Sequence, residues 1–140
     1  MTEGIEAVGD RAEIAELVSR HGHLIDAGRL DELDSVFTAD VVYDVSAYGF
    51  GALEGIPAIR DAALALGDGN PVGHHVTNVI VSVTDADSAA VVSKGLGVMA
   101  DGTCGSVVYE DIVRREPAGW RISYRKVVPR HRPLGRLPDP

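Results

Sequence analysis

Apolar residues recur between Asp10 and Gly28 at the spacing of one helical face. The positions on this face are Ile14, Leu17, Val18, His21, Leu24 and Ile25. Asp10, followed three residues later by Glu13, is typical of a helix N-cap, and Gly28 is typical of a helix end. The pattern therefore predicts a first helix that buries one face.

Two shorter helices are predicted after it. One begins at about Asp31, and its inner side carries Leu30, Leu33, Val36 and Phe37. The other opens at "GIPAIRDAALAL", where Pro57 suits the first helical turn. Between these two helices, "DVVYDVSAYGF" (40–50) is typical of a strand with a bend.

The pattern changes after Gly69 to four runs rich in Val, Ile and Tyr. These strand-like runs cover 73–84, 88–99, 104–115 and 119–128. The turn sequences "TDADS", "ADGT" and "REPAG" separate them and predict hairpins. Helices followed by an antiparallel meander indicate an α+β fold. We expect a single domain over 1–129 and an extended tail rich in proline and arginine over 130–140, which is wrapped over a surface or loose.

Charge and composition narrow the possible partners. The net charge is −8, with 21 acidic residues against 13 lysines and arginines, which argues against non-specific nucleic-acid binding. Acids gather in the first half and bases near the C-terminus, so either an acidic half packs beside basic strands or Arg130, Arg132 and Arg136 form a binding strip. We also expect no membrane span and no secretory signal. The lone Cys104 excludes an internal disulfide, and a reducing, cytoplasmic location fits.

Two ionisable residues of the first helix are candidates for chemistry. A curved sheet with helices on one face leaves a cone that suits a small apolar ligand with a few polar groups. His21 lies at the centre of the apolar helix face, where an imidazole needs either a core hydrogen-bond partner or a polar pocket. Asp26, in the last turn, falls off this face on an ideal helical wheel, so periodicity alone leaves it exposed.

Adjacent histidines, His74 and His75, stand at the head of "HHVTNVIVSV". Successive strand residues point to opposite faces, so one ring faces the core side and the other faces away. Val79, Val81 and Val83 share the parity of His75, and a bulge near Gly73 would reverse that assignment. Adjacent strand histidines cannot both bind one metal ion without distortion, and no metal site is expected.

Further polar groups lie on the predicted strands. The candidates for substrate binding are Tyr43, Asp44, Tyr48, Tyr109 and Asp111. In "VYEDIV" two acids interrupt an apolar run, and either one faces inward or both pair with bases on the next strand, Arg121, Arg125 or Lys126. The chain has no glycine-rich phosphate loop and no G-x-S-x-G elbow, so no cofactor is expected.

Four segments together resemble a known family over 8–129. They are "DRAEIAELVSRHGHLIDAGRLDELDSVFTADVVYDV", "LEGIPAIRDAAL", "HHVTNVIVSV" and "VYEDIVRREPAGWRISYRKV". In this order they are similar to a SnoaL-like domain of the nuclear-transport-factor-two-like superfamily, which includes scytalone dehydratase, bile-acid dehydratases, polyketide cyclases and ketosteroid isomerase. The resemblance implies a cone-shaped α+β barrel, three helices on a strongly curved, mostly antiparallel sheet, and a homodimer or trimer.

The resemblance also implies roles for particular residues. In the dehydratase branch a catalytic dyad joins an aspartate at the end of the first helix to a histidine of an "HxxxN" strand. Asp26 and one of His74 and His75 stand at those places; motif spacing favours His74, and strand parity favours His75. His21 stands where relatives often carry a tyrosine. Asp44 lies one residue from the place of the isomerase base, which weakens an isomerase assignment.

These features lead to a functional hypothesis. The chain is expected to be a cofactor-independent lyase, a dehydratase or cyclase, acting on a small apolar oxygenated ring compound of polyketide or steroid type. The histidine of the dyad would move the proton, and Tyr43, Tyr48 or His21 would stabilise the enolate. The alternatives are a ketosteroid-isomerase-like isomerase and a non-catalytic module for ligand binding or dimerisation.

Overall fold

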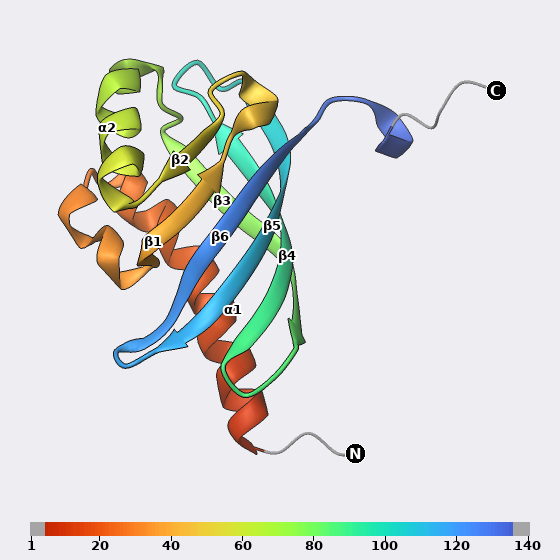
Figure 1. Ribbon diagram of the computed structural model, residues 1–140. Helices are drawn as coiled ribbons and strands as arrows, with labels where there is room; N and C mark the ends of the chain where they lie inside the picture. Colours follow the sequence, from red (N-terminus) through yellow and green to blue (C-terminus); the bar gives the residue numbers. More distant parts are fainter. Residues whose placement is uncertain (1–4, 136–140) are drawn as a thin grey trace.

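A computed structural model describes residues 5–135 of the chain (Figure 1). The elements are α1 (Ile5–Asp26), η1 (Leu30–Ser35), β1 (Phe37–Asp44), η2 (Ser46–Tyr48), β2 (Ala52–Glu54), α2 (Ile56–Leu66), η3 (Gly67–Gly69), β3 (Gly73–Val83), β4 (Ser88–Val98), β5 (Cys104–Glu116), β6 (Gly119–Arg130) and η4 (Pro133–Gly135). The helices precede the long strands, which confirms the α+β prediction.

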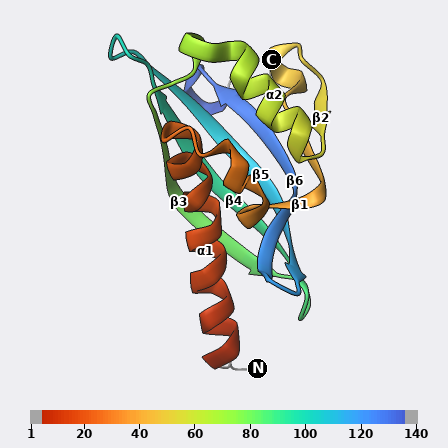
Figure 2. The same cartoon turned by 90° about the vertical axis from the view of Figure 1, so that its left-hand side faces the viewer.

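The six strands form one curved sheet in the order β2-β1-β6-β5-β4-β3. β1 runs parallel to β6, and every other neighbouring pair is antiparallel. The helices α1 and α2 and the turn η1 all cover one face of this sheet (Figures 1 and 2). The chain thus forms the open cone that the sequence predicts.

The core lies between α1 and the concave face of the sheet. The predicted apolar face of α1 is buried there through Ile14, Leu17, Val18 and Leu24. Val113 and Ile122 meet it from β5 and β6 and are fully buried. Full burial of such a side chain contributes about 1.5–3 kcal/mol, so this core stabilises the packing of α1 on the sheet.

The expected start of the first helix is wrong. α1 begins at Ile5, so Asp10 lies inside the helix rather than at its cap. Its carboxylate instead accepts hydrogen bonds from Arg115 (2.8 Å) and Trp120 (3.2 Å), and the bond from Arg115 is the main cause of its lowered pKa. The short second helix is present as η1, which is of the 3-10 type, and Phe37, expected on its inner side, instead begins β1.

The predicted bent strand over 40–50 is two strands with a turn between them. β1 begins earlier than expected, because Phe37 and Val41 are both buried in the core. The chain then turns through η2 and returns as the short β2, antiparallel to β1. Gly49 and Gly51, with φ angles of 85° and 74°, allow this reversal.

The last strand extends to Arg130, one residue beyond the expected domain boundary. Residues 131–135 then lead away from the body of the protein (Figure 1). Arg136, part of the alternative basic strip, lies outside the described residues. Within 5–135 no helix has the length and apolarity needed to cross a membrane.

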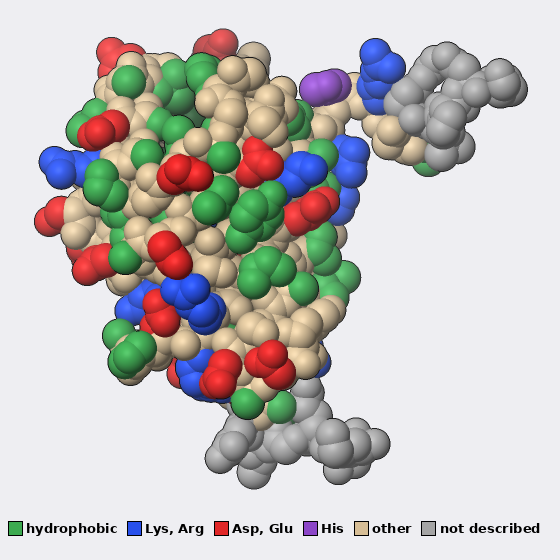
Figure 3. All heavy atoms as spheres, viewed as in Figure 1, with side chains coloured by type: hydrophobic (Ala, Val, Ile, Leu, Met, Phe, Trp, Pro, Cys, Tyr) green, Lys and Arg blue, Asp and Glu red, His purple; other side chains and the backbone are tan. Residues whose placement is uncertain are grey.

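The outer face of the sheet carries several exposed apolar side chains. Its exposed hydrophobic residues include Ile80 on β3, Val92 and Leu96 on β4, and Ile112 on β5. Figure 3, which views the sheet from this side, shows hydrophobic side chains gathered over the strands.

Candidate active site

The end of α1 and the start of β3 bring Asp26 and His74 together. His74 Nδ1 lies 2.6 Å from Asp26 Oδ1, and the backbone N–H of His74 donates to Asp26 Oδ2 at 2.9 Å. An ionised carboxylate only accepts hydrogen bonds, so Nδ1 carries the proton and Nε2 is left as the acceptor. The two side chains are 17% and 26% exposed, so the pair is sheltered but not fully buried.

A glycine allows this contact between helix and strand. A Cβ atom on the buried Gly22 would lie 2.5 Å from the backbone oxygen of His74. That distance is shorter than real Cβ contacts, so only glycine lets β3 approach α1 this closely. The approach brings His74 within reach of the last residue of the helix, although an ideal wheel places Asp26 off the buried face.

A β-bulge at Asn78 decides which histidine faces inward. Asn78 has a φ angle of 56°, and the pairing of β3 with β4 shifts between Thr77 and Ile80. The extra residue reverses the alternation, so His74 shares the inner face with the valines that pack on the core, Val76, Val79 and Val81. Strand parity pointed to His75 because the bulge lies in mid-strand rather than near Gly73. His75 is exposed on the other face.

His21 lies beside the pair on the inner face of α1. Its ring centroid is 6.1 Å from that of His74 and 6.0 Å from that of Tyr43. Burial, and then the charge of Arg125 and electrostatic coupling to His74, lower its pKa well below the usual value. His21 is therefore neutral at neutral pH, and its Nδ1 has no hydrogen-bond partner among the described residues.

Tyr43 completes this aromatic group from β1. Its ring makes an edge contact with Phe37, with centroids 5.9 Å apart. Burial raises the pKa of its hydroxyl strongly, and the nearby Arg125 opposes only part of that effect. Tyr43 therefore stays protonated and able to donate a hydrogen bond at any physiological pH.

A charged pair lies deeper in the cone. Arg125 Nε and Nη2 donate to the two carboxylate oxygens of Asp111 at 2.7 and 2.8 Å, and both side chains are fully buried. The guanidinium lies 4.2 Å from the ring centre of Tyr109, which is also buried. This arrangement bears out the cross-strand pairing expected for Asp111 and turns its carboxylate inward.

Comparison with known proteins identifies the family of this chain. The profile of the SnoaL-like domain matches residues 6–126. The chain belongs to the SnoaL-like domain family. It is 33% identical over 129 residues to an uncharacterized protein of Mycobacterium tuberculosis, with 86% of each chain covered.

Two solved structures show the same fold. An NTF2-like protein with a cystatin-like fold from Novosphingobium aromaticivorans is 28% identical, with 91% of this chain and 90% of that chain covered and a TM-score of 0.69. The hexachlorocyclohexane dehydrochlorinase of Novosphingobium barchaimii is 20% identical, with 93% of each chain covered and a TM-score of 0.75. The second likeness concerns the fold alone.

The other predicted site residues of this SnoaL-like chain lie apart from the dyad. Asp44 accepts hydrogen bonds from the backbone of Ser46 (2.9 Å) and from the hydroxyl of Tyr124 (3.3 Å), at the edge of the sheet. Tyr48, in η2, is 47% exposed. The pKa of Tyr109 is raised mainly by burial, and Tyr48 is close enough to add a smaller contribution. The structure therefore groups His21, Tyr43 and the dyad but not Asp44.

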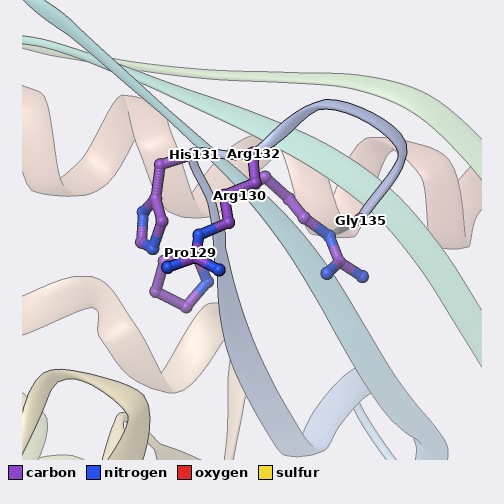
Figure 4. Close-up of a pocket in the computed structure, with 5 residues that line it drawn as sticks. All are labelled: Pro129, Arg130, His131, Arg132 and Gly135. Atoms are coloured by element: carbon purple, nitrogen blue, oxygen red, sulfur yellow. The ribbon is translucent and has the colours of Figure 1, made fainter. Parts of the chain in front are cut away.

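Two surface hollows of the described residues lie away from the dyad. One, of about 490 Å³, lies between α1 and η1, and Arg20 and Glu32 are among its lining residues. The other lies where the tail leaves β6, with Arg130, His131 and Arg132 around it (Figure 4). In the described part of the chain no three His, Cys, Asp or Glu side chains are arranged to hold a metal ion.

Sequence reasoning missed two contributors to the site. Gly22 gave a signal, since a glycine inside an amphipathic helix disfavours the helix and needs a packing reason. Arg125 was considered only as a partner for the acids of β5. Arg125 and Ile122 are both buried although they are three residues apart on β6, because the pairing with β5 shifts register between Ile112 and Val113. Regular strand alternation therefore did not predict the burial of Arg125.

Proposed function

We propose that this chain is a cofactor-independent lyase that removes water from, or cyclises, a small apolar ring compound bearing a carbonyl group. The observation that carries the proposal is the hydrogen bond between Asp26 and His74 Nδ1, which leaves Nε2 of the same ring as a proton acceptor beside the cone. Among the described residues nothing else bonds to Nε2. A positioned base of this kind contributes about 10²–10⁴-fold in rate.

The reaction follows from the groups around that nitrogen. His74 Nε2 removes a proton from the carbon next to the substrate carbonyl, and the electrons move to the carbonyl oxygen as an enolate. The enolate re-forms the carbonyl as the hydroxyl on the next carbon leaves. The protonated His74 returns its proton to that hydroxyl, so the products are a conjugated enone and water. Asp26 holds the ring in one tautomer and stabilises the imidazolium.

Two neutral hydrogen-bond donors near the dyad can stabilise the enolate oxygen. Tyr43 remains protonated, and the neutral His21 has one ring N–H to offer. A donor aimed at developing charge accelerates a reaction more than one that binds the substrate equally in all states. The same fold occurs in the dehydrochlorinase of Novosphingobium barchaimii, whose name denotes an elimination.

The test is water loss from a panel of cyclic β-hydroxy ketones, followed by the ultraviolet absorbance of the conjugated enone. Wild type is expected to turn over at least one member, and His74→Gln is expected to be about 100-fold slower or worse. The matched control is His75→Gln, which changes the adjacent ring on the other face and should retain full activity. If wild type gives no more enone than buffer, or if His74→Gln equals wild type, the lyase proposal fails and a binding module is the better account.

A further inference from the structure

The buried Arg125 has one nitrogen without a partner at full hydrogen-bond geometry, and the hydroxyl of Tyr43 lies close enough to interact with the guanidinium. Its Nε and Nη2 are paired with Asp111, whereas Nη1 has no hydrogen-bond partner among the described residues. The side chain is 0% exposed, so bulk water does not reach it. An unsatisfied donor on a buried charged group costs on the order of 1–3 kcal/mol or more.

The arginine belongs to the same inner surface as the dyad. On β6 it pairs in register with Tyr43 of β1 on one side and Asp111 of β5 on the other. The charge of Arg125 helps to lower the pKa of His21, and the ring of His21 lies next to that of His74. His21, Tyr43 and Arg125 therefore lie next to one another on the inner surface, beginning beside the dyad.

The surroundings hold the guanidinium in one orientation. Asp111 fixes two of its nitrogens in a bidentate geometry, and the ring of Tyr109 lies against the face of its plane. Gly95 of β4 makes room for that ring, since a Cβ there would lie 2.3 Å from Tyr109 Cε2. Ser93, two residues away on the same strand, contributes a second buried and unpaired polar atom to this face.

We propose that Arg125 Nη1 donates a hydrogen bond to the carbonyl oxygen of the substrate and stabilises the enolate formed there. The proposal rests on the lyase function above and names its substrate class: neutral ring ketones whose carbonyl reaches the Arg125 side of the cone while the neighbouring C–H faces His74. Asp111 already balances the charge of Arg125, which favours a neutral carbonyl in the ground state over a carboxylate. Asp111 acts as a positioning residue.

The experiment uses 4-nitrophenol as a mimic of the enolate, because its ionised form is read directly by visible absorbance. At a pH where the free phenol is half ionised, wild type is expected to raise the ionised-to-neutral ratio of the bound phenol about tenfold. The informative variant is Arg125→Met with Asp111→Leu, since removing a whole buried pair is often tolerated whereas removing one partner is not. This folded double variant should lose the enrichment or fail to bind.

Further variants separate this inference from the lyase function. Lys126→Met removes a positive charge from the exposed face of the same strand and should leave the enrichment unchanged. His74→Gln should abolish turnover and keep the enrichment. If wild type shows enrichment but no water loss, the lyase function fails and the oxyanion site stands. If the double variant fails to fold, Arg125→Lys is used instead, because a lysine ammonium cannot bond to both Asp111 and the oxygen of the bound phenol. Unchanged enrichment in either variant, or no binding to wild type, overturns the proposal.

Discussion

Replacing Asp26 by asparagine tests the dyad at the level of a single proton. The carboxylate accepts two hydrogen bonds from the same residue, one from His74 Nδ1–H and one from the His74 backbone N–H. An asparagine has one acceptor oxygen and one donor amino group in the same place. The backbone N–H cannot change its role, so it takes the oxygen, and the amino group is left facing Nδ1.

The tautomer of His74 then has to change. With an amino group donating to Nδ1, the ring proton moves to Nε2, and the nitrogen that faces the cone becomes a donor instead of a base. We expect Asp26→Asn to lower kcat by about 10²–10⁴-fold, the full contribution of a positioned base. The stability cost should be only about 1 kcal/mol, because the number of hydrogen bonds is kept and the pair is partly exposed.

Two measurements check this reasoning. Two-bond ¹H–¹⁵N correlation spectra of the imidazoles report which nitrogen of His74 carries the proton, and enone formation reports turnover. Asp31→Asn, the same change at an exposed acid beyond the helix, is the control for loss of charge. The reasoning is refuted if Asp26→Asn keeps the proton on Nδ1, or if it moves the proton to Nε2 while turnover stays within twofold of wild type.

Four further outcomes follow from the fold. Because the pKa of His21 is lowered in the folded protein, protonation of this residue favours the unfolded chain. The free energy of unfolding should therefore be at its full value above pH 6.5 and fall by up to about 1.4 kcal/mol per pH unit below it. Urea unfolding should show a smaller pH slope in His21→Gln and an unchanged slope in the exposed control His23→Gln. Gly22→Ala should push β3 from α1 and lower Tm by several degrees. Asn78→Val should cost about 1–2 kcal/mol in chemical denaturation, whereas Asn78→Gly should be tolerated. If the apolar outer face joins two copies into a homodimer, Ile112→Lys should give a monomer by light scattering, and an unchanged mass would rule this face out.

The apolar periodicity of the chain predicts most of the fold, because each helix or strand that buries one face needs apolar residues at regular spacing. The four long strands begin and end within two residues of their expected limits, since turn residues bound each of them. The expected start of α1 was wrong because Asp10 serves a tertiary contact. A capping signature is local, and the sequence gives no information on whether Arg115 and Trp120 will use the same carboxylate.

The candidate site was harder to predict because its geometry depends on two departures from ideal elements. Asp26 meets His74 only because Gly22 lets a strand lie closer to the helix than a side chain would allow. His74 faces inward only because Asn78 inserts one extra residue into β3. Helical wheels and strand parity assume regular geometry, so both rules pointed away from the residues that pair. The motif spacing from His74 to Asn78 was the better guide, because that spacing ends at the bulge itself.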